Sequence, residues 1–483
     1  MMKIALASLL GAEHLSVHRK NVFNELEPYG LLCIGGTAQS LGYDVKIFHP
    51  YQNANSTEEQ MVCNIIDYRP DILGISSMTN TFNRSVKLAE QVKSNYPYTK
   101  VIFGGDHIGT NASDVLNHPV IDVGVYGEGE ETFKELLLHY DSGQKNLENV
   151  FGIAFSKGDE IVITPPRPRL KDRTNLPLPL RDKEIIQASR IGPLMYPSYS
   201  DQTGVVTTML QFGCPLGCTY CSATTLYGKS LTRTSPERVV SELRNLKETF
   251  GVNTAFFTDL TFNLNHKLSE NLCSALEKEN LGMGWTAMVR PTSPLNQPML
   301  RESTLEAMVA GGCTKIAFGI ESLEESAMQD YHRPTSLGED EKTLRTIDRL
   351  GALSKVFLIV GHPNETVAYY DKVIQALKLL KPDEVRISYL TPFPGTELWK
   401  SLGDQREELL LTKTYNDYTT FKQVMKMRHV VPEVLEMQRR RILIEYYNSD
   451  EYLRHLKYKV KANPRFEKSF SEFHHLLRER RVI

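Results

Sequence analysis

Short runs of hydrophobic and β-branched residues alternate with amphipathic stretches over roughly the first 140 residues of the chain. Glycine and small polar residues bound the apolar runs, whereas the segments between them, such as SVKLAEQVKSNYP, place apolar positions at helical spacing. This order of strand, helix and strand predicts a parallel, doubly wound sheet, whose carboxyl edge is where ligands bind. The predicted strands are residues 3–8, 45–49, 72–77, 101–105 and 123–127.

The pattern changes after a predicted hairpin at residues 152–164. The next stretch, as far as residue 197, contains PPRPRL and NLPLPL and is interpreted as a linker, because proline disfavours both a long helix and a central strand. From residue 205 each strand is followed by one helix and another strand, which predicts an incomplete parallel (β/α)6 barrel rather than a second open sheet. The barrel strands are predicted at 205–212, 254–259, 284–289, 315–320, 356–361 and 384–390.

Beyond Trp399 the strand pattern stops, and the remaining residues predict helices. The predicted fold is therefore α/β, with an N-terminal Rossmann-like sheet, a partial barrel and a C-terminal helical region. The expected boundaries are 1–150 for the first sheet, 151–200 for the hairpin and linker, 201–400 for the barrel and 401–483 for the helical region.

Composition excludes several classes of protein. With 483 residues, 41% of them hydrophobic, the chain can form two or three domains with cores of their own. A formal net charge of −2 gives no overall attraction to nucleic acid or to an anionic membrane, and the basic residues 439–441 are interpreted as a solvated helix face. No apolar run approaches the roughly 20 residues that span a bilayer, and the N-terminus lacks a signal-peptide pattern. We therefore expect a cytoplasmic protein with neither a membrane nor a nucleic-acid partner.

Three of the seven cysteines lie within eight positions, directly after the first strand of the predicted barrel. An odd number of cysteines without a secretory signal does not indicate a disulfide framework. Thiolates this close can hold one iron–sulfur cluster, whereas a tetrahedral zinc site would need a fourth ligand, and the sequence contains no second C-x-x-C pair. The predicted metal ligands are Cys214, Cys218 and Cys221, and the residues interpreted as small buried hydrophobes are Cys33, Cys63, Cys273 and Cys313.

The arrangement C-x3-C-x2-C, with Tyr220 before the last cysteine, resembles the radical S-adenosylmethionine (SAM) superfamily. Three cysteines leave one iron without a protein ligand, and this open position can bind a small molecule. The resemblance implies a [4Fe-4S] cluster that binds SAM and, when reduced by a partner such as flavodoxin or ferredoxin, releases a 5'-deoxyadenosyl radical. Because the SAM zwitterion needs charges of both signs nearby, polar residues at the following strand ends are implied to bind it. The implied SAM site is Tyr220, Asp259, Arg290, Glu321, Ser322 and Arg333.

The first predicted sheet carries part of the signature of methionine synthase-type cobalamin domains, which is D-x-H-x-x-G, S-x-L and G-G. Ser76-Ser77-Met78 fits S-x-L with methionine for leucine, and Gly104-Gly105 follows after 25 residues. The same register puts Leu32 where the cobalt-ligating histidine would be, a departure that is expected in the cobalamin-dependent radical SAM family, which this region resembles. The implied cobalamin residues are Gly35, Ser76, Ser77, Thr79, Gly104, Gly105, His107, Gly127 and Glu128.

Over residues 1 to 400 the combined resemblance implies a cobalamin-dependent radical SAM methyltransferase. Such an enzyme removes hydrogen from an unactivated carbon of a small-molecule substrate with the 5'-deoxyadenosyl radical, and transfers a methyl group to that carbon from methylcobalamin. The barrel mouth and the sheet edge would then face each other across the substrate. Tyr389 and Phe393, near the end of the sixth barrel strand, are candidates for the substrate pocket.

Other functions fit parts of the same pattern. The layout also resembles cobalamin-dependent cyclases and ring-contracting enzymes that transfer no methyl group, and methyl-labelled SAM would distinguish them. A non-catalytic sensor of cobalamin or of the cluster is a further class, against which the three cysteines and the charged strand ends argue. Nicotinamide dinucleotide binding has little support, because the first turn, ASLLGAEHLS, lacks G-x-G-x-x-G. A methylthiotransferase would carry three further cluster cysteines in its N-terminal domain, where only Cys33 and Cys63 are present.

Overall fold

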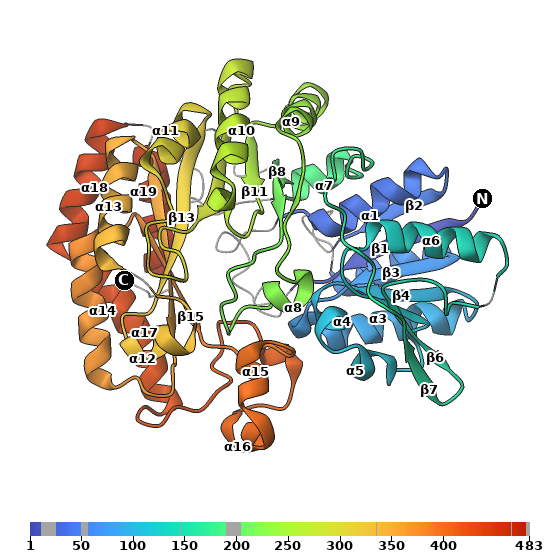
Figure 1. The fold of residues 1–483 in the computed structure, drawn as a ribbon. Helices are drawn as coiled ribbons and strands as arrows, with labels where there is room; N and C mark the ends of the chain where they lie inside the picture. The colour runs from blue at the N-terminus through green and yellow to red at the C-terminus, as the bar shows by residue number, and fades with distance from the viewer. Residues whose placement is uncertain are drawn as a thin grey trace.

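Two sheets dominate the structure, one in each half of Figure 1; the first is largely parallel and the second is entirely so. The structure is a computed structural model, and it describes residues 1–10, 26–49, 57–144, 146–189, 204–334, 336–464 and 466–479. The end of the predicted linker, residues 190–197, lies outside the described residues.

The first sheet has seven strands in the order β2-β1-β3-β4-β5-β6-β7, and the pairings among the first five are parallel. Its inner strands are continuous hydrophobic runs because helices cover both faces, α1 and α6 on one side and α2 to α5 on the other. The predicted doubly wound sheet is thus confirmed. The strands are Lys3–Ser8, Asp44–Phe48, Ile72–Ser76, Lys100–Gly104, Val123–Val125, Ile153–Lys157 and Glu160–Ile163 for β1 to β7, and the helices are Tyr29–Ser40, Glu58–Tyr68, Phe82–Asn95, Asp106–Thr110, Ala112–Leu116 and Glu130–Asp141 for α1 to α6, with a 3-10 turn η2 at Thr79–Thr81.

The predicted hairpin forms and becomes part of the first sheet. Strand β6 pairs antiparallel with β5 and with β7, so that the hairpin covers the edge that β5 would otherwise expose.

The second sheet has six parallel strands in the order β15-β14-β13-β12-β11-β8. In Figure 1 the strands follow one another around an arc with the helices outside, which confirms the predicted partial barrel. The strands are Val205–Thr208, Thr254–Phe257, Gly284–Val289, Cys313–Glu321, Leu353–Val360 and Glu384–Tyr389 for β8 and β11 to β15. The helices that follow them are α9 Pro236–Phe250, α10 His266–Glu279, α11 Glu302–Ala310, α12 Glu325–Asp330, α13 Leu337–Arg349 and α14 Val367–Leu380, with η3 at Phe262–Leu264.

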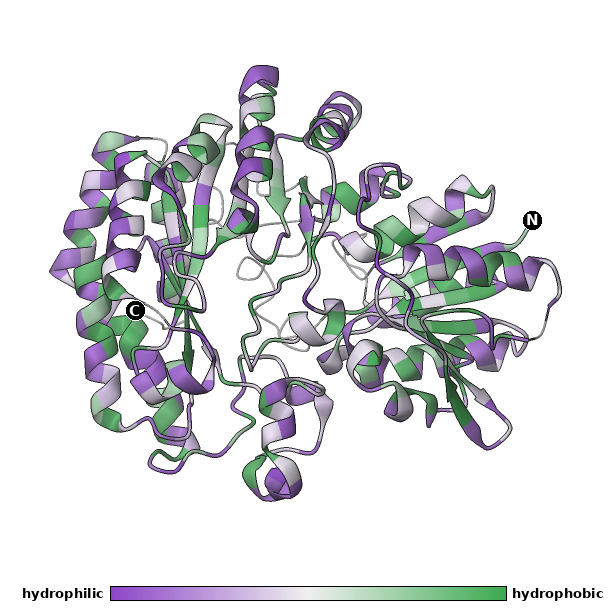
Figure 2. Cartoon of the chain, viewed as in Figure 1, coloured by the Kyte–Doolittle hydropathy of each residue, from purple (hydrophilic) through white to green (hydrophobic). Residues whose placement is uncertain are grey.

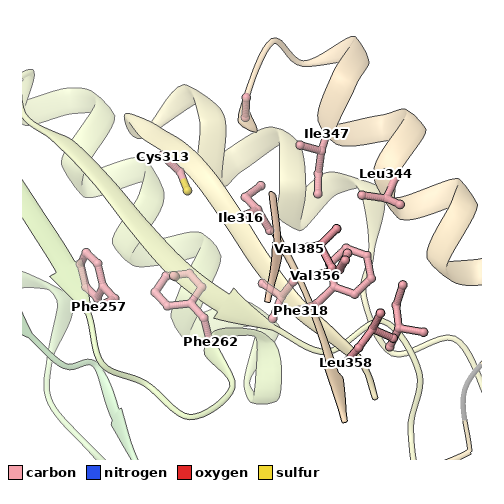
Figure 3. Close-up of a cluster of buried hydrophobic side chains, with 14 of the residues drawn as sticks. Phe257, Phe262, Cys313, Ile316, Phe318, Leu344, Ile347, Val356, Leu358 and Val385 are labelled. Atoms are coloured by element: carbon pink, nitrogen blue, oxygen red, sulfur yellow. The ribbon is translucent and has the colours of Figure 1, made fainter. Parts of the chain in front are cut away.

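Side chains along each barrel strand point alternately outward and inward, and this alternation determines where the core lies. On β14, Val356 and Leu358 point outward and pack with Leu344 of α13, as Figure 3 shows, whereas Lys355 lies on the inner face and pairs with Glu384 of β15 at 2.6 Å. The outward set forms the largest apolar cluster among the described residues. The barrel is therefore held by its contact with the helices, while polar side chains remain inside.

Three C-terminal helices pack on the barrel rather than forming a separate domain. Helix α17 lies against α14, and Lys459 of α18 reaches Asp348 at 2.6 Å and Asp383 at 3.3 Å. The segment between β15 and α17 instead reaches the first domain, where Tyr415 accepts a hydrogen bond from Asn111 at 3.1 Å. This region comprises α15 Glu397–Ser401, η4 Gly403–Gln405, α16 Arg406–Leu409, η5 Tyr415–Asp417, α17 Pro432–Tyr447, α18 Asp450–Ala462 and α19 Phe466–Glu479.

Hydropathy follows this arrangement: in Figure 2 the strands of the first sheet are green, whereas the outer helices carry purple faces. Within the described part of the chain, no helix is both long and apolar enough to cross a bilayer.

The linker fastens the two domains to each other. It runs along α1, where the Leu180 amide donates a hydrogen bond to the carbonyl of Leu32 at 2.8 Å. The residue after Leu180 is Arg181, whose buried side chain pairs with Glu27 at 2.8 Å and with Glu242 of α9 at 2.7 Å. The remaining short elements are α7 Lys183–Ala188, β9 Gln211–Phe212, α8 Ala223–Tyr227 and β10 Thr232–Arg233.

We expect Arg181→Met to lower the free energy of unfolding by about 3 kcal/mol, because it leaves two buried carboxylates without their counter-charge. Urea unfolding followed by circular dichroism measures the change. Arg345→Met is the matched control, since Arg345 is 78% exposed in its pair with Glu341, and such pairs contribute less than about 1 kcal/mol. Equal losses in the two variants would contradict a structural role for the linker ion pairs.

Candidate active site

The three cysteines of the motif lie together in one loop at the barrel mouth. The loop follows β8 and the short β9. Glycines turn it before the first cysteine and before the second, since Gly213 has φ +97° and Gly217 has φ +71°. Cys214, Cys218 and Cys221 are half-buried free thiols. Burial raises the pKa of Cys221 to about 11, although a backbone hydrogen bond from Ala223 opposes the shift. Three crowded thiols of this kind are suited to a cationic centre, which would stabilise them as thiolates.

A buried carboxylate accepts hydrogen bonds from the backbone just before this loop. Asp259 is fully buried at the end of β11 and accepts hydrogen bonds from the amides of Leu210 at 3.0 Å and Gln211 at 2.8 Å. Burial raises the pKa of Asp259 to about 7, while these two backbone donors lower it. The structure therefore places Asp259 under the start of the cysteine loop, where it orients the loop.

Two arginines lie beside Cys218, and one of them pairs with a glutamate. The Arg290 guanidinium donates to the Cys218 Sγ at 3.2 Å, and Arg333 lies 3.9 Å from the same sulfur. Arg333 also pairs with Glu321 at 3.3 Å and donates to the Gly319 carbonyl at 2.9 Å. Arg290 Nη2 and Arg333 Nε are buried without a hydrogen-bond partner among the described residues. Charges of both signs and unused donors beside the cysteines fit a zwitterionic ligand bound at the cluster.

The backbone is irregular at the end of β13, where Glu321 turns towards Arg333. The register with β14 shifts between Gly319 and Glu321, and Glu321 has φ +64°, a conformation that is unusual for a residue other than glycine. Its neighbour Ser322 points the other way, because its hydroxyl lies 3.1 Å from that of Tyr369 and accepts from the Glu324 amide at 3.1 Å. Glu321 therefore faces Arg333, whereas Ser322 supports the turn.

Tyr220 lies beside these charged groups. Its ring meets that of Tyr331 edge-on at 5.0 Å, and the pKa of Tyr220 is raised by burial and by Glu321. The structure thus brings together the cysteines with Tyr220, Arg290, Glu321 and Arg333.

Two loops of the cobalamin signature are joined at the carboxyl edge of the first sheet. The Ser77 amide donates to the Gly104 carbonyl at 2.9 Å, and the His107 amide donates to the Ser77 carbonyl at 3.2 Å. Gly105 has φ +93°, and a Cβ there would lie 2.7 Å from the Ser77 carbonyl oxygen. The close approach of the loops requires glycine at this position. The two loops therefore form one continuous backbone surface at the sheet edge.

Other predicted cobalamin residues lie elsewhere. Gly35 is in the middle of α1, where a Cβ would contact Ile47 of β2 at 3.0 Å and Leu180 of the linker at 3.2 Å. Glu128 accepts hydrogen bonds from Arg169 at 2.7 Å and from the Leu170 amide at 3.3 Å, so that it already binds the linker. The remaining loop residues are Ser76 and Thr79, at the end of β3 and in η2, and Gly127, which follows β5 with φ +79°.

His107 is packed between the first domain and the segment before α17. Its ring is fully buried between Phe82 at 4.3 Å and Tyr415 at 4.8 Å, and its Nδ1 lies 3.3 Å from the Thr79 hydroxyl. Burial lowers the pKa of His107 to about 4, so that the imidazole is neutral at physiological pH. His107 therefore orients η2 and the C-terminal segment.

A cavity of about 200 Å³ lies between the two domains. The first domain lines it with residues of the signature loops, and the other wall contains Ser222, directly after the last cysteine, with Phe393. Tyr389, in contrast, turns away from the mouth and hydrogen-bonds Arg439 of α17 at 3.0 Å. The lining residues are Met78, Thr79, Asn80, Asp106, Thr110, Ser222, Phe393, Pro394, Tyr418 and Thr419.

Sequence reasoning missed part of this lining. Asp106 follows the G-G pair directly and could have been found from its position, whereas nothing in the sequence links Tyr418 and Thr419 to the site. A larger cavity, of about 370 Å³, lies at the amino ends of β12 and β13, beside Trp285 and Cys313, and contains none of the candidate residues.

Comparison with known proteins identifies a domain family in each half of the chain. Residues 16–137 match the B12 binding domain family, and residues 208–377 match the radical SAM superfamily. A protein of Pyrococcus horikoshii described as an uncharacterized methyltransferase is 29% identical over 87% of this chain and 87% of its own length. The anaerobic magnesium-protoporphyrin IX monomethyl ester cyclase of Rubrivivax gelatinosus is 24% identical over 79% of this chain and 67% of its own.

The fold is also that of a solved enzyme structure. The radical SAM methyltransferase TsrM of Kitasatospora setae, determined with cobalamin and a [4Fe-4S] cluster bound, superposes with a TM-score of 0.68 at 16% identity, over 87% of this chain and 86% of that one. The two domain matches cover the sheet with the joined glycine loops and the barrel with the cysteine motif. The chain belongs to the cobalamin-dependent radical SAM enzymes.

Proposed function

We propose that this enzyme transfers a methyl group from cobalamin to an unactivated carbon of a small-molecule substrate. One observation carries the proposal: a single cavity is lined by the cobalamin signature loops on one side and by the residue after the cluster cysteines on the other. Both cofactors could then act on one bound substrate. The similarity to the Pyrococcus methyltransferase supports the same reaction class.

The chain's residues divide between three ligands in this proposal. Cys214, Cys218 and Cys221 would hold the [4Fe-4S] cluster, and the charged groups Arg290, Glu321 and Arg333 would bind SAM beside Tyr220. The joined loops that contain Ser76, Ser77, Thr79, Gly104, Gly105 and Gly127 would hold cobalamin. We leave Gly35, His107 and Glu128 out of this proposed set, because their contacts are with other parts of the protein. When bound, the cluster and SAM supply a radical that removes a hydrogen atom from the substrate, and cobalamin supplies the methyl group.

The protein side chains prepare the site for these ligands. Arg290 and Arg333 place their positively charged guanidinium groups beside the Cys218 sulfur, at 3.2 Å and 3.9 Å. Glu321 keeps a negative charge in the same region, and its partner Arg333 holds it in position. Phe393 and Tyr418 present aromatic rings at the cavity, with their centroids 6.3 Å apart, and so limit the access of water.

The remaining partners follow from the same assignment. We propose a one-electron reductant such as flavodoxin or ferredoxin, because the cluster must be reduced before SAM is cleaved. All seven cysteines are free, which suits the reducing conditions of the cytoplasm.

Methyl-labelled SAM tests the reaction. We expect the anaerobic holoenzyme, given a strong reductant, to transfer the label from SAM to bound cobalamin, and then to a product when a small-molecule fraction of the host is added. Mass spectrometry of the cobalamin and the products measures the label. Omission of cobalamin is the control and should abolish label transfer.

Ring closure without methyl transfer is the second candidate, and the similarity to the Rubrivivax cyclase favours it. Formation of 5'-deoxyadenosine with no label in cobalamin or in any product would support this candidate and contradict methyl transfer.

A further inference from the structure

One side chain of the linker contacts the segment with the cysteine motif at both of its ends. The Arg169 guanidinium donates to the Phe212 carbonyl at 3.2 Å, before the first cysteine, and to the Tyr227 carbonyl at 2.8 Å, after the last. It also donates to the carbonyl of Ser230. Arg169 therefore fastens together the two ends of the segment that carries the cluster ligands.

The glycine before the first cysteine allows this close approach. Gly213 has φ +97°, and a Cβ there would lie 2.9 Å from Arg169 Nη1 and 2.8 Å from the Ser230 carbonyl oxygen. A side chain at this position would push the guanidinium away from the loop. Strands β9 and β10 pair at the same place, through Phe212 and Thr232, so that the arginine adds to a backbone closure of the loop.

The same guanidinium binds a carboxylate of the first domain. Arg169 donates to Glu128 Oε1 at 3.0 Å from Nε and at 2.7 Å from Nη2. Glu128 lies between β5 and α6, directly after Gly127 at the carboxyl edge of the first sheet, and also accepts from the Thr232 hydroxyl at 3.1 Å. The Arg169 and Glu128 side chains are only 18% and 11% exposed, so water competes little with their contact.

A second linker arginine has contacts of a similar kind but in another direction. The segment PPRPRL favours an extended polyproline II backbone, in which side chains two residues apart point to different sides. Arg167 donates to Thr132 of α6 at 2.7 Å and pairs with Glu135, and its side chain is 22% exposed. Because these contacts lie within the first domain, Arg167 is a matched control for Arg169.

We infer that Arg169 is a positioning residue that fixes the cysteine loop relative to the cobalamin loops; the inference rests on the proposed function. Methyl transfer from SAM to cobalamin needs groups held by both domains, whereas reductive cleavage of SAM needs only those of the barrel. In the transfer, the carbon–sulfur bond of SAM breaks with its electron pair left on sulfur, and an electron pair of cob(I)alamin forms the carbon–cobalt bond. A displacement of about 1 Å between reacting groups can slow a reaction roughly 100-fold, so the transfer between domains should depend on Arg169.

Arg169→Gln and Arg167→Gln separate the two reactions. The anaerobic holoenzymes, with a strong reductant, are given methyl-labelled SAM, and mass spectrometry follows the label in cobalamin and the release of 5'-deoxyadenosine. We expect Arg169→Gln to slow labelling of cobalamin about tenfold and to change 5'-deoxyadenosine formation less than about twofold. Its iron and cobalt content should equal that of the wild type. Arg167→Gln should change neither rate.

Hydrogen–deuterium exchange of the same holoenzymes gives a readout that does not depend on turnover. We expect residues 126–130 and 213–231 to exchange about fivefold faster in Arg169→Gln, with the rest of the barrel unchanged. Glu128→Gln removes the other partner and should reproduce both effects. Because the two side chains act through one contact, the double variant should be no slower than either single variant.

Two results would overturn the inference while leaving the proposed function intact. Equal slowing of both reactions, with loss of iron or faster exchange throughout the barrel, would show that Arg169 only stabilises the barrel. Unchanged labelling and exchange would show that the β9–β10 pairing holds the loop without it. If the wild-type protein transfers no label to cobalamin, the proposed function fails, even where exchange of both segments still rises in Arg169→Gln.

Discussion

Replacing Cys214, Cys218 and Cys221 together with alanine will remove the iron of the anaerobically purified protein, about four atoms per chain, and will abolish reductive cleavage of SAM. The physical reason is that these thiolates are the ligands that the cysteine loop offers, so their loss leaves no protein bond to the cluster. Iron and sulfide analysis, with detection of 5'-deoxyadenosine by mass spectrometry, measures both losses.

The cobalamin content of the same variant is the internal control. Because the cobalamin loops belong to the other domain and touch one another through Ser77, Gly104 and His107, the variant should still bind one cobalt per chain after reconstitution. Iron retained in the triple variant would contradict the cluster assignment. Cobalt lost together with the iron would instead show that the two sites do not fold independently.

Gly105→Ala is expected to weaken cobalamin binding roughly 100-fold. Its Cβ would lie 2.7 Å from the carbonyl oxygen and 2.8 Å from the amide nitrogen of Ser77, so that the two signature loops must separate. The backbone at φ +93° adds strain for any residue with a side chain. Titration with aquacobalamin, followed by visible absorbance, measures the loss, and the iron content should not change.

Gly143→Ala separates the clash from the backbone strain. Gly143 also has a positive φ, +70°, but a Cβ there meets nothing within 4 Å. This control should cost about 1 kcal/mol of stability and leave cobalamin affinity unchanged. If both variants bound cobalamin equally well, the joined loops would not be the cobalamin site.

The elements of this fold were predictable because their signals are local. Apolar runs such as ILGIS in β3 and KIAFGI in β13 form strands, and the segments between them form helices, as expected from the periodicity. The cysteine motif was predictable for the same reason, since its three ligands lie within one loop. Linker residues were harder to interpret: proline content indicated an irregular segment, but not that Arg181 would join Glu27 to Glu242.

The sequence predicted which residues lie at the strand ends better than it predicted where their side chains point. Asp106 and His107 are adjacent after the G-G pair, and the sequence favoured the histidine as the ligand-facing residue. The structure buries His107 beside Phe82 and exposes Asp106, because the start of α4 turns consecutive side chains to different sides. Asp259 and Ser322 likewise end barrel strands as predicted, yet both form hydrogen bonds within the protein.

The sequence by itself determined the two kinds of sheet, the cysteine motif and the family, because each rests on spacing within a short segment. Only the tertiary structure decided which residues share the cavity, since Met78, Asp106, Ser222 and Tyr418 come from four separate parts of the chain. Their meeting depends on how the linker fastens the domains and on how the segment before α17 packs against η2, and such long-range packing has no local signal in the sequence.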